Sequence, residues 1–299
     1  VNNFFDPNNQ HTVKVLPFLG EYSWSVIIAS LVLAFCVAAV LIGGVKRIAS
    51  VSQVIVPFMA VIYIVFVLVL VVCNITAVPA AFAIIVKAAF SPKAITGGAV
   101  GSFLVAMQKG VARGIFSNEA GLGSAPIAAA AAQTKEPVRQ GLVSMTGTFI
   151  DTIVICTLTG LSIVLTGAWQ VDGLEGVQVT TYAFQHGLPF PKEISAFVLM
   201  LCLVFFAFTT ILGWDYYSER CLEYLSGGRM KYVKVYRWIY ILAVFIGPYM
   251  TVSAVWTIAD IFNGLMALPN MIALFALSGV VVKETKHFFE RHRNGEIED

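Results

Sequence analysis

The chain has 299 residues, of which 58% are hydrophobic and only 12% are charged, and its mean hydropathy is +0.83. Soluble domains carry roughly 25% charged residues, so this composition is typical of a membrane protein. The formal net charge is +2, and no basic tract is interleaved with aromatic residues, which argues against a nucleic-acid partner.

Seven segments are predicted to cross the membrane, because a spanning helix needs about 20 mostly apolar residues. Six of them are continuous apolar runs, and the remaining one is broken in its middle by glycines and polar residues. A shorter apolar stretch, Ala77 to Phe90, contains Lys87, and we expect it to lie along the membrane interface. The predicted spans of this single domain are 24–43, 51–72, 98–132 (broken), 142–166, 194–214, 238–252 and 258–282.

Basic residues between the predicted spans indicate the orientation, since Lys and Arg concentrate in cytoplasmic loops. If Trp24 faces outside, most of the 19 basic residues lie in the cytoplasmic segments. This arrangement predicts a cytoplasmic C-terminus. Splitting the last span at Pro269 would give eight crossings and place the basic C-terminal tail outside, so we favour seven.

The broken span carries four glycines, an Arg, a Glu, an Asn and two serines between residues 110 and 126. Unsatisfied backbone in lipid is costly, so this polar stretch is expected to be buried or to line a cavity. We predict a non-helical break from Ile115 to Gly123. Its free N–H groups would attract a carboxylate, and its free carbonyls a cation or an ammonium group. The candidate substrate-binding residues are Gly110, Gly114, Ile115, Phe116, Ser117 and Asn118.

An alternative interpretation is that the glycines only allow helices to pack closely. Close packing accounts for Ala128–Ala132 but not for Arg113, Asn118 and Glu119 together. Since single charges in the membrane are costly, we predict a structural pair or a gate formed by Arg113 and Glu119.

Two acids and one amide lie in other predicted spans, and each has more than one interpretation. Asp151 is either a hydrogen-bond partner in helix packing, which we favour, or part of a proton or ion path. Asp260 and Asn263 in the last span are ambiguous in the same way.

Two adjacent hydroxyls, Thr209 and Thr210, lie in an otherwise apolar span and could join backbone carbonyls as ligands for an alkali cation. Trp214 follows Thr210 by one turn on the same face and could line a pocket. Alternatively, the threonines bond back to carbonyls of their own helix, and Trp214 lies at the membrane interface. The residues by themselves leave both interpretations open.

The stretch 113–126 strongly resembles the hallmark segment of the alanine or glycine:cation symporters. The resemblance continues through 137–142 and 149–152, and upstream through 43–47 and 56–59, so it covers essentially the whole chain. It implies a LeuT-type inverted-repeat fold of the APC superfamily, all-α, with the seven spans as helices five to eleven. The first broken helix of the family and the two that follow it have no counterpart here, so we expect an N-terminally truncated chain.

In that fold, the third helix of the second repeat gives paired hydroxyls to a sodium site. The resemblance therefore implies that Thr209 and Thr210 bind sodium, that Phe206 adds a backbone carbonyl, and that Trp214 faces the substrate.

The implied function is sodium-coupled symport of alanine or glycine across the cytoplasmic (inner) membrane by alternating access, with Na⁺ as coupling ion and no cofactor. Alternatives are a proton-coupled or other small-amine carrier of the same fold, a channel, or a non-transporting amino-acid sensor. An enzyme is not expected, because no histidine lies within a predicted span to serve as a base or metal ligand. The four histidines are His11, His186, His287 and His292.

Overall fold

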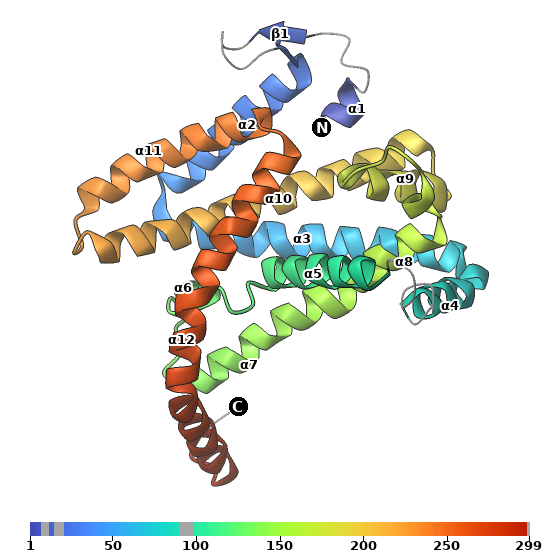
Figure 1. The fold of residues 1–299 in the computed structure, drawn as a ribbon. Coiled ribbons are helices and arrows are strands. Elements are labelled where there is room, and N and C mark those ends of the chain that lie inside the picture. Colours follow the sequence, from blue (N-terminus) through green and yellow to red (C-terminus); the bar gives the residue numbers. More distant parts are fainter. Residues whose placement is uncertain (7–11, 15–20, 90–98, 298–299) are drawn as a thin grey trace. The chain divides into compact units, whose positions relative to one another are not determined.

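The computed structural model describes residues 1–6, 12–14, 21–89 and 99–297 (Figure 1). The chain divides into two compact units. The first unit comprises Val1–Ala89 and Thr157–Thr251, and the second comprises Phe90–Cys156 and Val252–Asp299.

The first unit begins with a short helix, α1 (Asn2–Phe5), and a hairpin of β1 (Thr12–Lys14) and β2 (Glu21–Ser23). The strands are antiparallel, with Thr12 opposite Ser23. The all-α prediction misses this hairpin, because three-residue strands are too short to show an alternating pattern in the sequence.

Long helices make up the rest of this unit. In it, α3 packs against α10 and α2 packs against α11 (Figure 1). Buried aliphatic side chains of α2, α3 and α10, including Val37, Ile48 and Leu212, form a core between these helices. The helices are α2 (Trp24–Leu41), α3 (Gly44–Cys73), α4 (Val78–Ala89), α8 (Thr157–Leu165), α9 (Val177–Gly187), α10 (Lys192–Leu225) and α11 (Met230–Ile246), with 3₁₀ turns η1 (Ile75–Ala77), η4 (Ala168–Gln170) and η5 (Gly247–Tyr249).

The second unit contains α5 (Ala99–Asn118), α6 (Ala125–Ala129), α7 (Pro137–Thr148), the π-helix η3 (Phe149–Cys156) and α12 (Val252–Arg293). Within it, α5 contacts η3 and α12 contacts α7. Helix α12 runs through Pro269 without a break, so the last predicted span is not divided there.

Five helices among the described residues are long and apolar enough to cross a membrane. Their large apolar side chains are mostly exposed, as at Phe35 (74%), Ile272 (72%) and Phe275 (73%), and such a surface is suited to contact with lipid. The five are Trp24–Leu41, Gly44–Cys73, Pro137–Leu165, Lys192–Leu225 and Val252–Arg293.

Two predicted spans, 98–132 and 238–252, are not among these five long helices. Residues 238–252 correspond to α11, which begins earlier, at Met230, and gives way to η5 at Gly247. The broken span contains one long helix, α5, and then only the five-residue α6.

Candidate functional site

The break in the polar span lies between α5 and α6. Glu119, Gly121 and Gly123 have φ angles of 50°, 75° and 79°, in the left-handed region that ends a right-handed helix. Glycine adopts this conformation readily, which explains why Gly121 and Gly123 mark the break. Glu119, without that freedom, is the one non-glycine residue with positive φ in the described part of the chain.

The prediction that the break starts at Ile115 is wrong, since residues 115–118 belong to α5. The carbonyl of Ile115 accepts the backbone N–H of Ala120 at 3.1 Å, and that of Phe116 accepts the N–H of Glu119 at 3.4 Å. Ile, Phe, Ser and Asn do not force a helix to end, so the helix continues until the first residue of positive φ. The non-helical part is therefore Glu119 to Ser124.

Side chains hold this turn in place. The Ser124 hydroxyl, 1% exposed, donates to the Glu119 carboxylate at 2.7 Å. From α12, the Asn270 amide donates to the carbonyl of Gly121 at 2.9 Å. A Cβ added at Gly123 would lie 3.0 Å from Oδ1 of Asn270, so this close approach also requires glycine.

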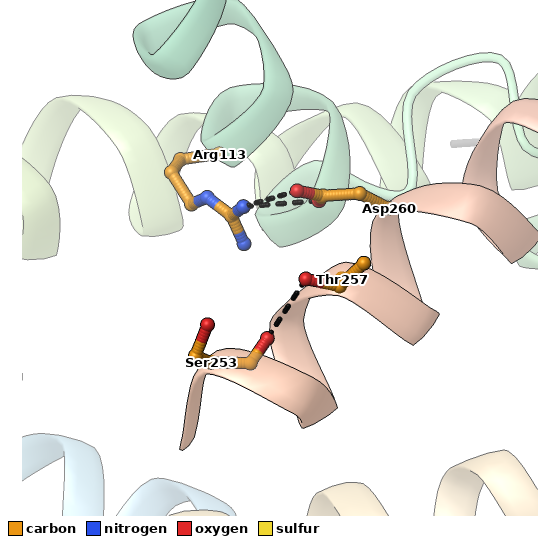
Figure 2. A network of polar contacts seen from close by, with 4 residues as sticks. All are labelled: Arg113, Ser253, Thr257 and Asp260. Carbon is orange, nitrogen blue, oxygen red and sulfur yellow. Dashed lines mark hydrogen bonds and ion pairs between the residues drawn. The ribbon is translucent and has the colours of Figure 1, made fainter. Parts of the chain in front are cut away.

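Arg113 and Glu119 do not form the predicted pair. Nη2 of Arg113 donates to Oδ1 and Oδ2 of Asp260 at 2.9 and 2.8 Å, whereas Glu119 is engaged by Ser124. Six residues of helix separate Arg113 from Glu119, which places them on different faces, while Asp260 on α12 lies directly opposite the guanidinium (Figure 2).

The Arg113 guanidinium also lies over the ring of Trp256, with its central carbon 3.8 Å from the ring centroid. Phe116, one turn further along α5, packs edge-on against the same ring at 5.4 Å. Nη1 of Arg113 is buried without a hydrogen-bond partner among the described residues, and Thr257 and Ser253 occupy the preceding turns of α12 (Figure 2).

The last turn of α5 is bound to the π-helix η3. The Ser117 hydroxyl donates to Oδ2 of Asp151 at 2.6 Å, and Nδ2 of Asn118 donates to the Thr152 hydroxyl at 2.7 Å. Asp151 thus makes the helix-packing hydrogen bond that the sequence favoured. A π-helix is rare and is frequently found at functional sites, and here five of its eight residues are β-branched, a type with reduced α-helix propensity.

In the first unit, Thr209 and Phe206 are already bonded to each other. The Thr209 hydroxyl donates to the carbonyls of Phe205 at 3.0 Å and Phe206 at 3.2 Å. This is the back-bonding that the sequence left open as an alternative. Thr210 is exposed, and Trp214 packs edge-on against Tyr217 at 5.6 Å.

The candidate residues therefore fall into two groups. Those of α5 lie in the second unit, and Phe206, Thr209, Thr210 and Trp214 lie in the first. Sequence reasoning missed Trp256 and Asn270 as partners of the break and left Asp260 undecided. The i, i+4 spacing of Trp256 and Asp260 in an apolar run was the available signal.

Comparison with known proteins gives a consistent result. The sequence matches the sodium:alanine symporter family over residues 7–299. An uncharacterized transporter of Haemophilus influenzae is 55% identical over 267 residues, which is 89% of this chain and 58% of the relative. The sodium/alanine symporter AgcS of Methanococcus maripaludis is 48% identical over 271 residues, 90% of this chain and 58% of the relative. GlnT of Bacillus subtilis, named a probable sodium/glutamine symporter, is 38% identical over 291 residues, 97% of this chain and 59% of the relative.

The chain thus spans less than two thirds of the length of these relatives. The match still extends over both units, and so includes the broken span as well as α10. The chain belongs to the sodium:alanine symporter family.

Proposed function

We propose that the protein carries a small neutral amino acid, alanine or glycine, into the cell together with Na⁺ by alternating access. The fold we propose is the LeuT-type inverted repeat in the cytoplasmic membrane, with the C-terminus in the cytoplasm. Membership of the family and the distribution of basic residues between the spans support this proposal.

The observation that carries the proposal is the end of α5 at Asn118, inside the predicted broken span. Among the described residues, no backbone N–H and no side chain donates to the carbonyls of Ser117 and Asn118. The C-terminal end of a 20-residue helix also carries partial negative charge. Two free carbonyls at such an end suit the ammonium group of an amino acid or a sodium ion.

One face of α5 leaves room for a ligand beside these carbonyls. A Cβ added at Gly110 or Gly114 would meet no described atom within 4 Å. Gly110, Gly114 and Asn118 are four residues apart in turn, so they share a face of the helix. We propose that the substrate lies along this face, with Ile115, Phe116 and Ser117 as further contacts. The proposal that Trp214 faces the substrate rests on the family resemblance alone.

The sodium site that we propose on α10 consists of Thr209, Thr210 and the carbonyl of Phe206. Because the Thr209 hydroxyl is a donor in its present bonds, its oxygen keeps lone pairs that can face an ion. The exposed Thr210 supplies the second hydroxyl.

We also propose that Arg113 acts as a gate with Asp260 and not with Glu119. Both side chains are about one third exposed, at 35% and 39%, so their ion pair can separate without leaving a fully buried charge. The Glu119–Ser124 hydrogen bond is left with a structural role in the turn.

The test is uptake of radiolabelled alanine by the full-length protein reconstituted in liposomes, with and without an inward Na⁺ gradient. We expect Na⁺-dependent uptake that Asn118→Ala reduces at least tenfold, whereas Asn294→Ala, in the turn after α12, leaves it unchanged. Uptake that ignores Na⁺ but is abolished by a protonophore would instead indicate a proton-coupled carrier. Binding of alanine without uptake would indicate a sensor. If glutamine inhibited alanine uptake more strongly than glycine did, the proposed substrate would be wrong.

A further inference from the structure

Asp215 on α10 is a fully buried carboxyl group without a hydrogen bond. Its exposed fraction is 0%, and neither Oδ1 nor Oδ2 has a hydrogen-bond partner among the described residues. An isolated carboxylate is costly to bury, so such a group is normally paired with a cation or carries a proton.

The nearest guanidinium is already used by a second acid. Glu219, one turn beyond Asp215, is 4% exposed, and its two carboxylate oxygens accept hydrogen bonds from Nε and Nη2 of Arg237 at 2.6 and 2.9 Å. This bidentate pair leaves Arg237 balanced by one negative charge. Two buried acids therefore share a single positive charge.

The other side chains that face Asp215 supply no cation. Tyr236 and Tyr240 of α11 lie close to it, and the Tyr240 hydroxyl donates to the carbonyl of Ile211. From the start of α3, Lys46 and Arg47 are exposed, and no ion pair joins either to an acid in the described part of the chain.

The remaining helices packed against α10 are α1, α2 and α9. The first two carry no charged residue. His186 of α9 contacts Lys192, at the opposite end of α10.

Asp215 and Glu219 are four residues apart on α10, so their buried carboxyl groups lie on the same face of the helix. Two carboxylates are both acceptors, so a hydrogen bond between them requires a proton on one. We propose that Asp215 carries a proton and donates it to the Glu219 carboxylate, so that the Asp215–Glu219–Arg237 cluster is a binding site for one proton. With Asp215 neutral, the negative charge of Glu219 balances the positive charge of Arg237. The Asp215 carboxyl group then has a hydrogen-bond partner in Glu219.

This proton lies on the same helix as the proposed sodium ligands, five residues after Thr210. Loss of the proton would leave two adjacent negative charges at one turn of α10, and so would change the packing of this turn against α11. A link between this proton and sodium binding rests on the proposed function, whereas the presence of the proton does not.

The experiment is infrared spectroscopy of the purified full-length protein in lipid. We expect a carbonyl stretch of a protonated carboxylic acid at neutral pH, which shifts in heavy water, disappears at alkaline pH and is lost in Asp215→Asn. Asp172→Asn, at an exposed acid outside the helices, is the matched control and should retain the band.

Glu219→Gln provides a second readout if Asp215→Asn folds poorly. Its neutral side chain leaves the Arg237 charge to be balanced by Asp215 alone, so Asp215 should ionise and the band should be lost at neutral pH. Absence of the band in the wild-type protein at neutral pH, or its persistence in Asp215→Asn, would overturn the proposal. None of these results depends on transport, so the outcome stands apart from the uptake assay.

Discussion

Arg113 and Asp260 form an ion pair across α5 and α12, in which one guanidinium nitrogen lies 2.8 and 2.9 Å from the two carboxylate oxygens. The guanidinium also lies over the ring of Trp256, on the same helix as Asp260 and one turn before it. The ion pair and the cation–π contact together restrain the orientation of the Arg113 side chain.

A double-mutant cycle of Arg113→Ala and Asp260→Asn should give a coupling free energy of about 0.5 to 1 kcal/mol, because both groups are partly exposed. Arg113→Lys should not restore the wild-type stability, since an ammonium group cannot stack on Trp256 in the same way. Unfolding in detergent measures each variant. Thr257→Val, which removes only a bond to the Ser253 carbonyl, is the control, and additive effects of the pair would contradict the expectation.

Gly123→Ala should destabilise the protein by about 1 to 3 kcal/mol. The alanine would have to keep the left-handed backbone conformation of Gly123, which is unfavourable for a residue with a side chain. Its Cβ would also lie 3.0 Å from Oδ1 of Asn270. Gly141→Ala, within α7 and without any described atom near its added Cβ, should be neutral or stabilising by about 0.5 to 1 kcal/mol. Thermal unfolding compares the two, and equal effects would show that the turn is not under this constraint.

Arg237→Ala should destabilise the protein by about 3 to 5 kcal/mol, because it leaves the buried Glu219 carboxylate without its partner. The control is Arg220→Ala, which removes a half-exposed pair with Glu223 and should change stability by about 1 kcal/mol or less. Melting temperatures in the same detergent provide the measurement. A small effect at Arg237 would mean that Glu219 loses its charge when the arginine is removed.

Thr209→Val should raise the Na⁺ concentration for half-maximal uptake by roughly tenfold. This corresponds to a loss of about 1.4 kcal/mol of Na⁺ binding free energy when one ligand oxygen is removed. Thr209→Ser keeps the hydroxyl and should remain near wild type. Uptake at graded Na⁺ concentrations is the measurement. If valine and serine behave alike, then the back-bonded hydroxyl is structural only, as its bonds to Phe205 and Phe206 would suggest.

The lengths of apolar runs predict where helices lie but not where they end. Helix α10 continues to Leu225, well past the predicted end at 214. Hydropathy indicates which residues can lie in the bilayer, but it does not indicate where a helix ends. Its true end is set by Gly227 and Gly228, both with positive φ, a signal that is present in the sequence.

Pairing between distant side chains was much harder to predict. A single sequence shows that Arg113 needs a partner, but it does not show that the partner is 147 positions away on α12. The sequence predicted the break itself but placed its start four residues too early. The polar residues Ser117 and Asn118 were assigned to the break, whereas their side chains bind η3.

The π-helix η3 has a mechanical consequence for the end of α5. Returning its hydrogen bonds to the α-helical pattern would advance the register by one residue, which corresponds to about 100° of rotation around the axis. Asp151 and Thr152 would then turn away from Ser117 and Asn118. A twist confined to eight residues could thus release the side chains of Ser117 and Asn118, next to the free carbonyls of the same residues, while every other turn of both helices keeps its hydrogen bonds.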